Sequence, residues 1–142
     1  MFMSRKHKKS AWVTKSNTVE KPWGHEVVWS GFTGIHAKTL HIKAGCRTSF
    51  KYNTQKNETL FLRKGSALAT FGNEYSLSDP GPENPIEERE MKEGDVLHVQ
   101  SCCPYRIEAI EDCEIIEVGN SLTSLSVRIE DDFGRCDNES DE

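Results

Sequence analysis

No stretch of the chain approaches the roughly 18 consecutive apolar residues that a membrane-spanning helix needs, so the sequence predicts no such helix. Residues 1–9 are basic, but no apolar segment follows them, which argues against a secretory signal. The five cysteines are odd in number, and Cys102 is adjacent to Cys103, so we expect no disulfide framework. Together these absences predict a reduced, cytoplasmic protein with no membrane association.

An apolar stripe of helical period is also absent. Hydrophobic residues make up 35% of the 142 residues, and three Trp and six Phe exclude a fully disordered chain. Leu40 and Ile42 alternate with His41 and Lys43, which is the period of a half-buried strand. Short apolar bursts of this kind occupy residues 26–29, 35–42, 59–62, 66–71, 95–99, 105–109 and 113–118. The sequence therefore predicts an all-β domain, a sandwich or barrel, with a proline-rich loop at residues 78–85.

Charge is unevenly distributed along the chain, whose net charge is −5. Residues 1–15 carry five Lys or Arg and no acid, whereas residues 130–142 carry seven acids and one arginine. Terminal charge runs are usually solvated and mobile. We therefore expect a basic flexible arm at residues 1–19, one folded domain at residues 20–135 and an acidic flexible tail at residues 136–142. A basic arm can contact nucleic acid, but the acidic net charge argues against nucleic acid as the main partner.

Two segments place glycines and polar residues at fixed intervals. The first has the pattern Gly-x5-Lys-x-Asn-x4-Glu-x6-Gly from Gly45 to Gly65, and the second runs from Gly94 to Tyr105. This spacing resembles the two motifs of the cupin family, with several of the residues changed. The resemblance implies a single-domain cupin, which is a small β-barrel of the jelly-roll type.

Four polar side chains are expected to meet in the mouth of this barrel. Residues two apart on a strand face the same side, so Lys51 and Asn53 both point inward, while Glu58 and Tyr105 enter from other strands. In typical cupins these four positions are His, His, Glu and His and hold a divalent metal; only Glu58 is retained here. Because a protonated lysine has no lone pair, we expect no resident metal, and the Lys51 ammonium to pair with Glu58 in its place. If Zn, Mn or Fe binds, Glu58 and Asn53 are the expected ligands.

Segments outside the two motifs narrow the resemblance. Glu20-Lys-Pro-Trp-Gly-His-Glu26 and Val127-Arg-Ile-Glu-Asp-Asp-Phe-Gly-Arg135 resemble segments of the C-terminal cupin domain of bacterial bifunctional mannose-6-phosphate isomerases. The similarity extends over residues 20–135. It implies a role in carbohydrate metabolism and a metal-dependent aldose–ketose isomerisation, in which a base moves a proton between neighbouring carbons. Members of that family have Gln at position 51 and His at positions 53 and 105, so the metal site of this chain is degenerate.

We therefore expect a small-molecule-binding cupin whose ligand is a sugar or sugar phosphate. If the chain is an isomerase, Lys51 stabilises a developing oxyanion, Glu58 carries the proton and Arg128 contacts the anionic group. The further predicted ligand contacts are Asn53, Tyr105 and Arg135. Two alternatives stay open: an active metal-dependent sugar-phosphate isomerase or epimerase, and a non-catalytic regulatory or scaffolding cupin.

The strand histidines His36, His41 and His98 favour surface or hydrogen-bonded positions over metal ligation. A shifted metal site that combines one of them with Glu58 stays open. Trp23 is expected to plug one end of the barrel.

Cys102 and Cys103 are expected to be small apolar fillers, with a reactive thiol near Arg106 as the alternative. Cupins commonly pair through strand edges, and an unpaired edge needs covering. We therefore expect a homodimer.

Overall fold

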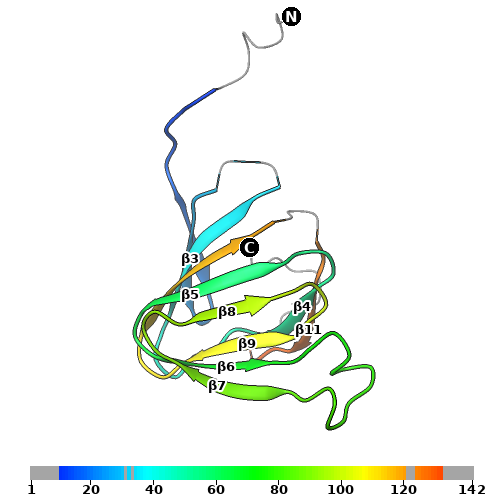
Figure 1. Ribbon diagram of the computed structural model, residues 1–142. Coiled ribbons are helices and arrows are strands. Elements are labelled where there is room, and N and C mark those ends of the chain that lie inside the picture. The colour runs from blue at the N-terminus through cyan, green and yellow to red at the C-terminus, as the bar shows by residue number, and fades with distance from the viewer. Residues whose placement is uncertain (1–9, 31, 33, 121–123, 133–142) are drawn as a thin grey trace, which may run out of the picture.

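The computed structural model describes residues 10–30, 32, 34–120 and 124–132, and every regular element in these ranges is a strand. The strands form two antiparallel sheets that pack face to face as a jelly roll (Figure 1). No helix among the described residues is long and apolar enough to cross a membrane. The all-β fold predicted from the alternating apolar bursts is confirmed.

The larger sheet contains six strands, all antiparallel to their neighbours. In spatial order they are β1 (Asn17–Lys21), β2 (Gly24–Val28), β3 (His36–Ile42), β10 (Cys113–Gly119), β5 (Glu58–Lys64) and β8 (Val96–Val99). The smaller sheet contains five strands. Their order is β11 (Ser126–Glu130), β4 (Phe50–Asn53), β9 (Tyr105–Ala109), β6 (Ala67–Phe71) and β7 (Glu87–Met91).

The register of β3 and β10 sets the chemistry of the interior. Leu40 lies opposite Ile115, and two residues further along each strand Lys38 lies opposite Glu117. All four side chains are buried, because residues two apart on a strand share a face. The same pair of strands therefore lines one part of the interior with apolar groups and the adjacent part with charges.

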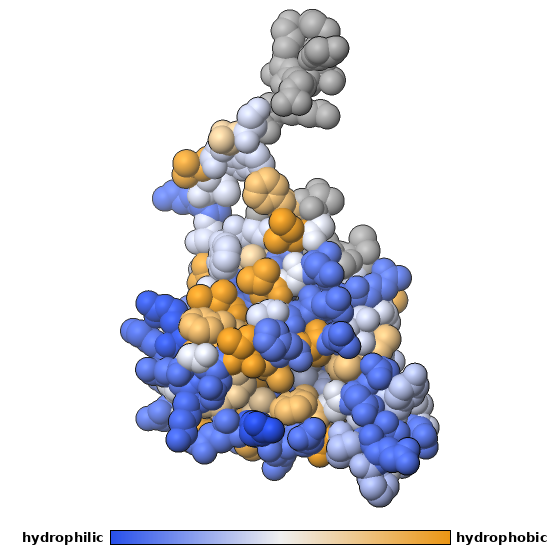
Figure 2. All heavy atoms as spheres, in the orientation of Figure 1, coloured by the Kyte–Doolittle hydropathy of each residue, from blue (hydrophilic) through white to orange (hydrophobic). Residues whose placement is uncertain are grey.

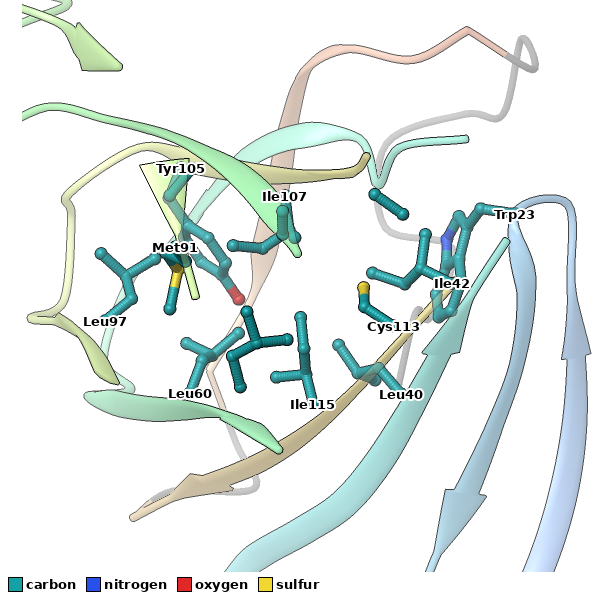
Figure 3. Close-up of a cluster of buried hydrophobic side chains, with 14 of the residues drawn as sticks. Trp23, Leu40, Ile42, Leu60, Met91, Leu97, Tyr105, Ile107, Cys113 and Ile115 are labelled. Carbon is teal, nitrogen blue, oxygen red and sulfur yellow. The ribbon is translucent and has the colours of Figure 1, made fainter. Parts of the chain in front are cut away.

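The apolar core fills the space between the sheets. Figure 3 shows Trp23, Ile42 and Cys113 at one end of this core and Tyr105 at the other. Trp23 is 1% exposed, which is the position expected for a residue that plugs one end of a barrel. Burial raises the pKa of the Cys113 thiol to about 11, so this cysteine packs as an apolar group.

Four strands lie outside the predicted apolar bursts: β1, β4, β7 and β11. β1 begins at Asn17, within the segment predicted as a basic arm. β7 has the sequence Glu-Glu-Arg-Glu-Met and pairs with β6 along its whole length. Backbone pairing to a neighbouring strand makes such a segment a strand, and its side chains carry no apolar pattern that would predict it. The predicted loop at residues 78–85 contains only turns and an isolated bridge.

Candidate functional site

Three of the four predicted pocket residues meet at one carboxylate. Asn53 ends β4, Glu58 begins β5 and Tyr105 begins β9, and all three are buried. Asn53 Nδ2 donates a hydrogen bond of 3.0 Å to Glu58 Oε1, and the Tyr105 hydroxyl donates one of 2.6 Å to the same oxygen. Lys51, also buried, lies directly opposite Tyr105 in the pairing of β4 with β9. The motif spacing therefore brings these side chains together inside the barrel.

The second oxygen of Glu58 faces two cations that the motif spacing does not indicate. Oε2 is 3.3 Å from Nε2 of His36, the first residue of β3. It is 3.5 Å from Nζ of Lys56, whose side chain is fully buried in the connection between β4 and β5. The carboxylate thus has neutral donors on one oxygen and cations on the other. Lys51 stays a predicted further partner of Glu58.

His36 also contacts Glu117 on β10, with 2.5 Å between Nε2 and Oε2. Burial by itself would lower the pKa of His36, but its interactions with Glu117 and Glu58 outweigh burial and raise the pKa to about 9. Burial would likewise raise the pKa of Glu117, but Lys38, His36 and Lys51 hold it well below its usual range. At neutral pH the pair is therefore an imidazolium and a carboxylate.

The ionic chain continues from Glu117 across the interior. Lys38 Nζ lies 3.9 Å from Glu117 Oε2 and 2.7 Å from Glu26 Oε2. Glu26 in turn lies 4.0 Å from Nζ of Lys21 through its other oxygen. Burial raises the pKa of Glu26, and the neighbouring Lys38 only partly offsets this. Charged side chains from β1, β2, β3, β5 and β10 therefore form one connected network.

Buried cations outnumber buried carboxylates at the inward-facing positions of the barrel. The buried carboxylates are Glu26, Glu58 and Glu117. The buried cations are Lys38, Lys51, Lys56, Arg128 and the protonated His36. Arg128 lies opposite Lys51 in the pairing of β11 with β4, which places both on the same face of the smaller sheet. An interior with this balance favours an anion over a further cation.

A small cavity lies where the ionic network meets the apolar core. Its volume is about 10 Å³, which is room for about one water molecule. It is lined by Trp23, Glu26, Lys38, Leu40, Thr48, Lys51, Leu60, Tyr105, Ile107 and Glu117. A molecule the size of a sugar does not fit inside this cavity.

The four positions that hold a metal in typical cupins do not fit one here. Asn53 and Tyr105 already donate to Glu58, and a protonated Lys51 offers no lone pair. A different set does offer suitable donors, because one atom each from His36, Glu58 and Glu117 lie within 4.8 Å of one another. One imidazole and two carboxylates suit zinc or iron(II).

Metal binding by this His36–Glu58–Glu117 triad requires a neutral imidazole. It also has to overcome repulsion from the ammonium groups of Lys56 and Lys38, which lie 3.5 Å and 3.9 Å from the carboxylates. These cations already neutralise the charge that a metal ion would neutralise.

The other residues singled out in the sequence are two arginines and two strand histidines. Arg128 is buried, and Arg135 lies outside the described residues. His41 lies on the outer side of β3, and His98 is exposed on β8.

The two adjacent cysteines lie in the connection between β8 and β9. Cys102 is exposed, adopts φ 70°, and donates its N–H to the Asn53 carbonyl over 2.7 Å. Burial, aided by Glu74, raises the pKa of Cys103. A raised pKa opposes a reactive thiolate at Cys103.

The motif analysis missed Lys56 and Glu117, because Glu117 lies outside the motifs and Lys56 lies in the connection between β4 and β5. His36 was expected at a surface or hydrogen-bonded position, with a shifted metal site beside Glu58 left open, and the structure places it next to Glu58. One signal was available. Glu117 shares the inward parity of Cys113 and Ile115, so a charge at that position contradicts an apolar inner face. A buried charge at a core position is the pattern that marks a site.

No family model matches the sequence, and no curated protein matches it. Solved structures share the fold. Oxalate decarboxylase from Bacillus subtilis is 17% identical with a TM-score of 0.62, and the match covers 75% of this chain and 27% of that protein. The vicilin from Solanum melongena is 15% identical with a TM-score of 0.58, covering 67% of this chain and 26% of that protein. KdgF from Halomonas sp. is 11% identical with a TM-score of 0.58, covering 73% of this chain and 86% of that protein.

These neighbours are cupin-fold proteins, so the predicted single-domain cupin fold is confirmed. The chain spans about a quarter of the length of the first two. The closer resemblance to mannose-6-phosphate isomerases stays a prediction.

Proposed function

We propose that the protein is a cupin that binds a small anionic molecule without a resident metal, and that this molecule is a sugar phosphate. The excess of buried cations over buried carboxylates in the barrel interior carries the proposal. A phosphate or carboxylate is attracted to an interior in which buried cations outnumber buried carboxylates. The vicilin that shares the fold holds anionic ligands in structurally similar pockets. The sugar phosphate comes from the sequence resemblance.

Only the charged group of such a ligand would approach the inner cations. The cavity beside Lys51 and Tyr105 measures about 10 Å³, so the sugar ring would lie outside it. Arg128 would contact the phosphate, and Arg135 is the further predicted contact. An arginine suits this role because its planar fork of donors matches phosphate oxygens.

The same residues allow an isomerisation that uses no metal. Glu58 would remove the proton from the carbon beside the carbonyl and return it to the neighbouring carbon, while Lys51 would stabilise the developing oxyanion. Asn53 and Tyr105 hold one oxygen of Glu58, and the other oxygen, which would carry the proton, faces His36 and Lys56.

Thermal shift and calorimetry with matched ligands test the binding proposal. We expect mannose 6-phosphate and fructose 6-phosphate to raise the melting temperature, because a ligand that binds only the folded state stabilises it. Mannose and fructose should not. Arg128→Gln should weaken the effect, whereas Arg63→Gln, which removes an exposed cation, should leave it unchanged. No shift with any phosphate would favour the regulatory or scaffolding alternative.

A second candidate is a metal-dependent isomerase built on the triad of His36, Glu58 and Glu117, whose donor atoms lie within 4.8 Å of one another. Metal analysis of protein purified without chelator separates the two candidates. Near-stoichiometric zinc, manganese or iron that is lost in His36→Gln would favour the second. Interconversion of the two sugar phosphates that is lost in Glu58→Gln would establish catalysis in either case.

A further inference from the structure

The outer face of the six-stranded sheet is apolar although it is open to solvent. Its central row consists of the paired residues Val27, Thr39, Ile116, Phe61 and Val96. The adjacent row consists of Trp29, Ala37, Val118, Thr59 and His98. Figure 2 shows apolar side chains gathered over β5 and β8 with charged side chains around them. A contiguous apolar surface of this kind marks an interaction site.

The third row of this face is polar, and the two charges of the salt bridge within it cancel each other. The rings of His25 and His41 stack with their centroids 4.4 Å apart. Arg63 Nη1 lies 2.7 Å from Glu114 Oε2, so these two charges neutralise each other. The whole chain has a net charge of −5, which repels a second copy elsewhere. The two apolar rows of this face hold no Asp, Glu, Lys or Arg, so the repulsion is weaker there.

A pocket of about 330 Å³ lies at the polar end of the face. It is lined by Gly24, His25, His41, Ile42, Lys43, Lys64, Asp112, Cys113 and Glu114. Its volume is that of a small binding site.

Two large apolar side chains are exposed at the opposite end of the same face. Trp29 is 46% exposed and donates its indole N–H to Thr39 Oγ1 over 3.1 Å, which holds the ring against the outer face. Ile35 precedes β3 on the outward parity of Ala37 and Thr39 and is 45% exposed. The face therefore has a pocket at one end and protruding groups at the other.

If two copies pack face to face about a two-fold axis along the central row, the pocket end of each copy lies against the opposite end of the other. Trp29 and His25 lie equally far from Val27 along β2. The axis would therefore place Trp29 of one copy opposite His25 of the other. By the same count from Thr39, Ile35 would lie opposite Lys43. Both His25 and Lys43 line the pocket, so the face is complementary to itself.

The area of the face suits a stable dimer. Five strands spaced ~4.8 Å apart are ~24 Å wide, and the eight-residue distance from Ile35 to Lys43 is ~27 Å. This footprint of ~650 Å² per copy falls within the ~600–1,000 Å² that each partner contributes to a standard interface.

One free edge of the smaller sheet, that of β7, suits a partner less well. β7 exposes Glu87, Glu88, Arg89 and Glu90 along its free edge. Two such edges would oppose like charges, which is how proteins prevent edge-to-edge pairing.

From these features we infer that the protein forms a homodimer through the outer face of its six-stranded sheet, with Trp29 and Ile35 of each copy seated at the pocket of the other. This arrangement replaces pairing through strand edges. The charged interior of each barrel stays outside the interface.

Sedimentation of the full chain and of single variants at micromolar concentration tests this interface. The wild type should sediment as a dimer, and both Trp29→Asp and Phe61→Lys should sediment as monomers. Ile86→Lys is the matched control, because Ile86 is 47% exposed in the loop before β7, away from the face, and this variant should stay dimeric. Circular dichroism and melting temperature verify that each variant is folded, and Trp29→Asp keeps the test valid if Phe61→Lys misfolds.

Photo-crosslinking tests the two-fold arrangement itself. Trp29→benzoylphenylalanine should crosslink to residues 24–25 or 41–43 of a second chain, identified by mixing isotopically labelled and unlabelled protein. A monomeric wild type would overturn the inference, and so would a dimer that persists in both face variants. A dimer whose crosslinks map to other segments would overturn the arrangement.

Discussion

The two ends of the barrel interior are built by the same strands but hold opposite kinds of side chain. At one end, Leu40 and Ile42 of β3 pack with Cys113 and Ile115 of β10. At the other end, the same two strands present the charged residues of the network around Glu117. The change occurs within two residues along each strand. The same pair of strands can therefore carry either apolar or charged side chains on its inner face.

The difference between the ends indicates what each contributes. Apolar burial stabilises the fold by ~25 cal/mol per Å². Buried ion pairs rarely exceed the stability of an apolar replacement, since desolvation offsets their attraction. The buried charges at this end therefore add little to the stability of the fold, and their presence indicates a binding or catalytic role.

Breaking the charged end should produce the largest effect. Glu117→Leu leaves His36 and Lys38 without their shared carboxylate, and we expect it to lower the free energy of unfolding by ~3–5 kcal/mol. Urea unfolding measures this change. Ile115→Val, the neighbouring inward position at the apolar end, should cost only ~0.5–1.5 kcal/mol. Equal costs would mean that the two ends do not differ energetically.

The charged end should also make stability depend on pH. The pKa of His36 is raised to about 9 in the folded state, above its ordinary value of about 6.5. Its contribution is therefore fully present below pH ~6.5 and is lost as the pH rises through ~9. We expect the free energy of unfolding to fall over this range by a few kcal/mol, and His36→Gln to flatten the profile. An unchanged profile in His36→Gln would assign the titration to another group.

Removing one hydrogen bond to Glu58 should have a smaller effect. Tyr105→Phe deletes the hydroxyl that lies 2.6 Å from Oε1 and should cost ~1.5–3 kcal/mol, the range for hydrogen bonds to charged groups. Tyr75→Phe, at a residue that is 57% exposed, is the control and should cost almost nothing. Thermal and urea unfolding of both variants would show whether Glu58 depends on this donor.

An exposed ion pair should matter least. Arg47 contacts Asp132 through two hydrogen bonds of 2.6 Å and 2.9 Å, but both side chains are 38% exposed. We expect Arg47→Ala to cost at most ~1 kcal/mol and the cost to shrink in high salt. A cost as large as that of Glu117→Leu would remove the contrast between buried and exposed charges.

The motif spacing predicted the part of the site that lies on consecutive strands. Asn53, Glu58 and Tyr105 converge as expected because alternation and turn length fix which side chains face inward. The hypothesis that an ammonium replaces the metal was made for Lys51, and the structure places Lys56 beside Glu58 Oε2. Position 56 lies in a turn, where no periodicity says which way a side chain points.

The network beyond Glu58 could not be predicted in this way. His36 and Glu117 belong to neighbouring strands of the larger sheet but are 81 residues apart in sequence. Their meeting depends on β10 entering between β3 and β5. Nothing in the local sequence of either strand encodes that order.

The sequence by itself determined that this protein is made of strands, which residues of each strand face inward, and that the site has a carboxylate in place of a full set of metal ligands. Those properties follow from side-chain period and turn chemistry, which are local. Only the tertiary structure decided which distant strands lie side by side. It therefore decided that three carboxylates share one interior with a larger number of cations, because the energy of a buried charge depends on whichever groups the fold brings within a few ångströms.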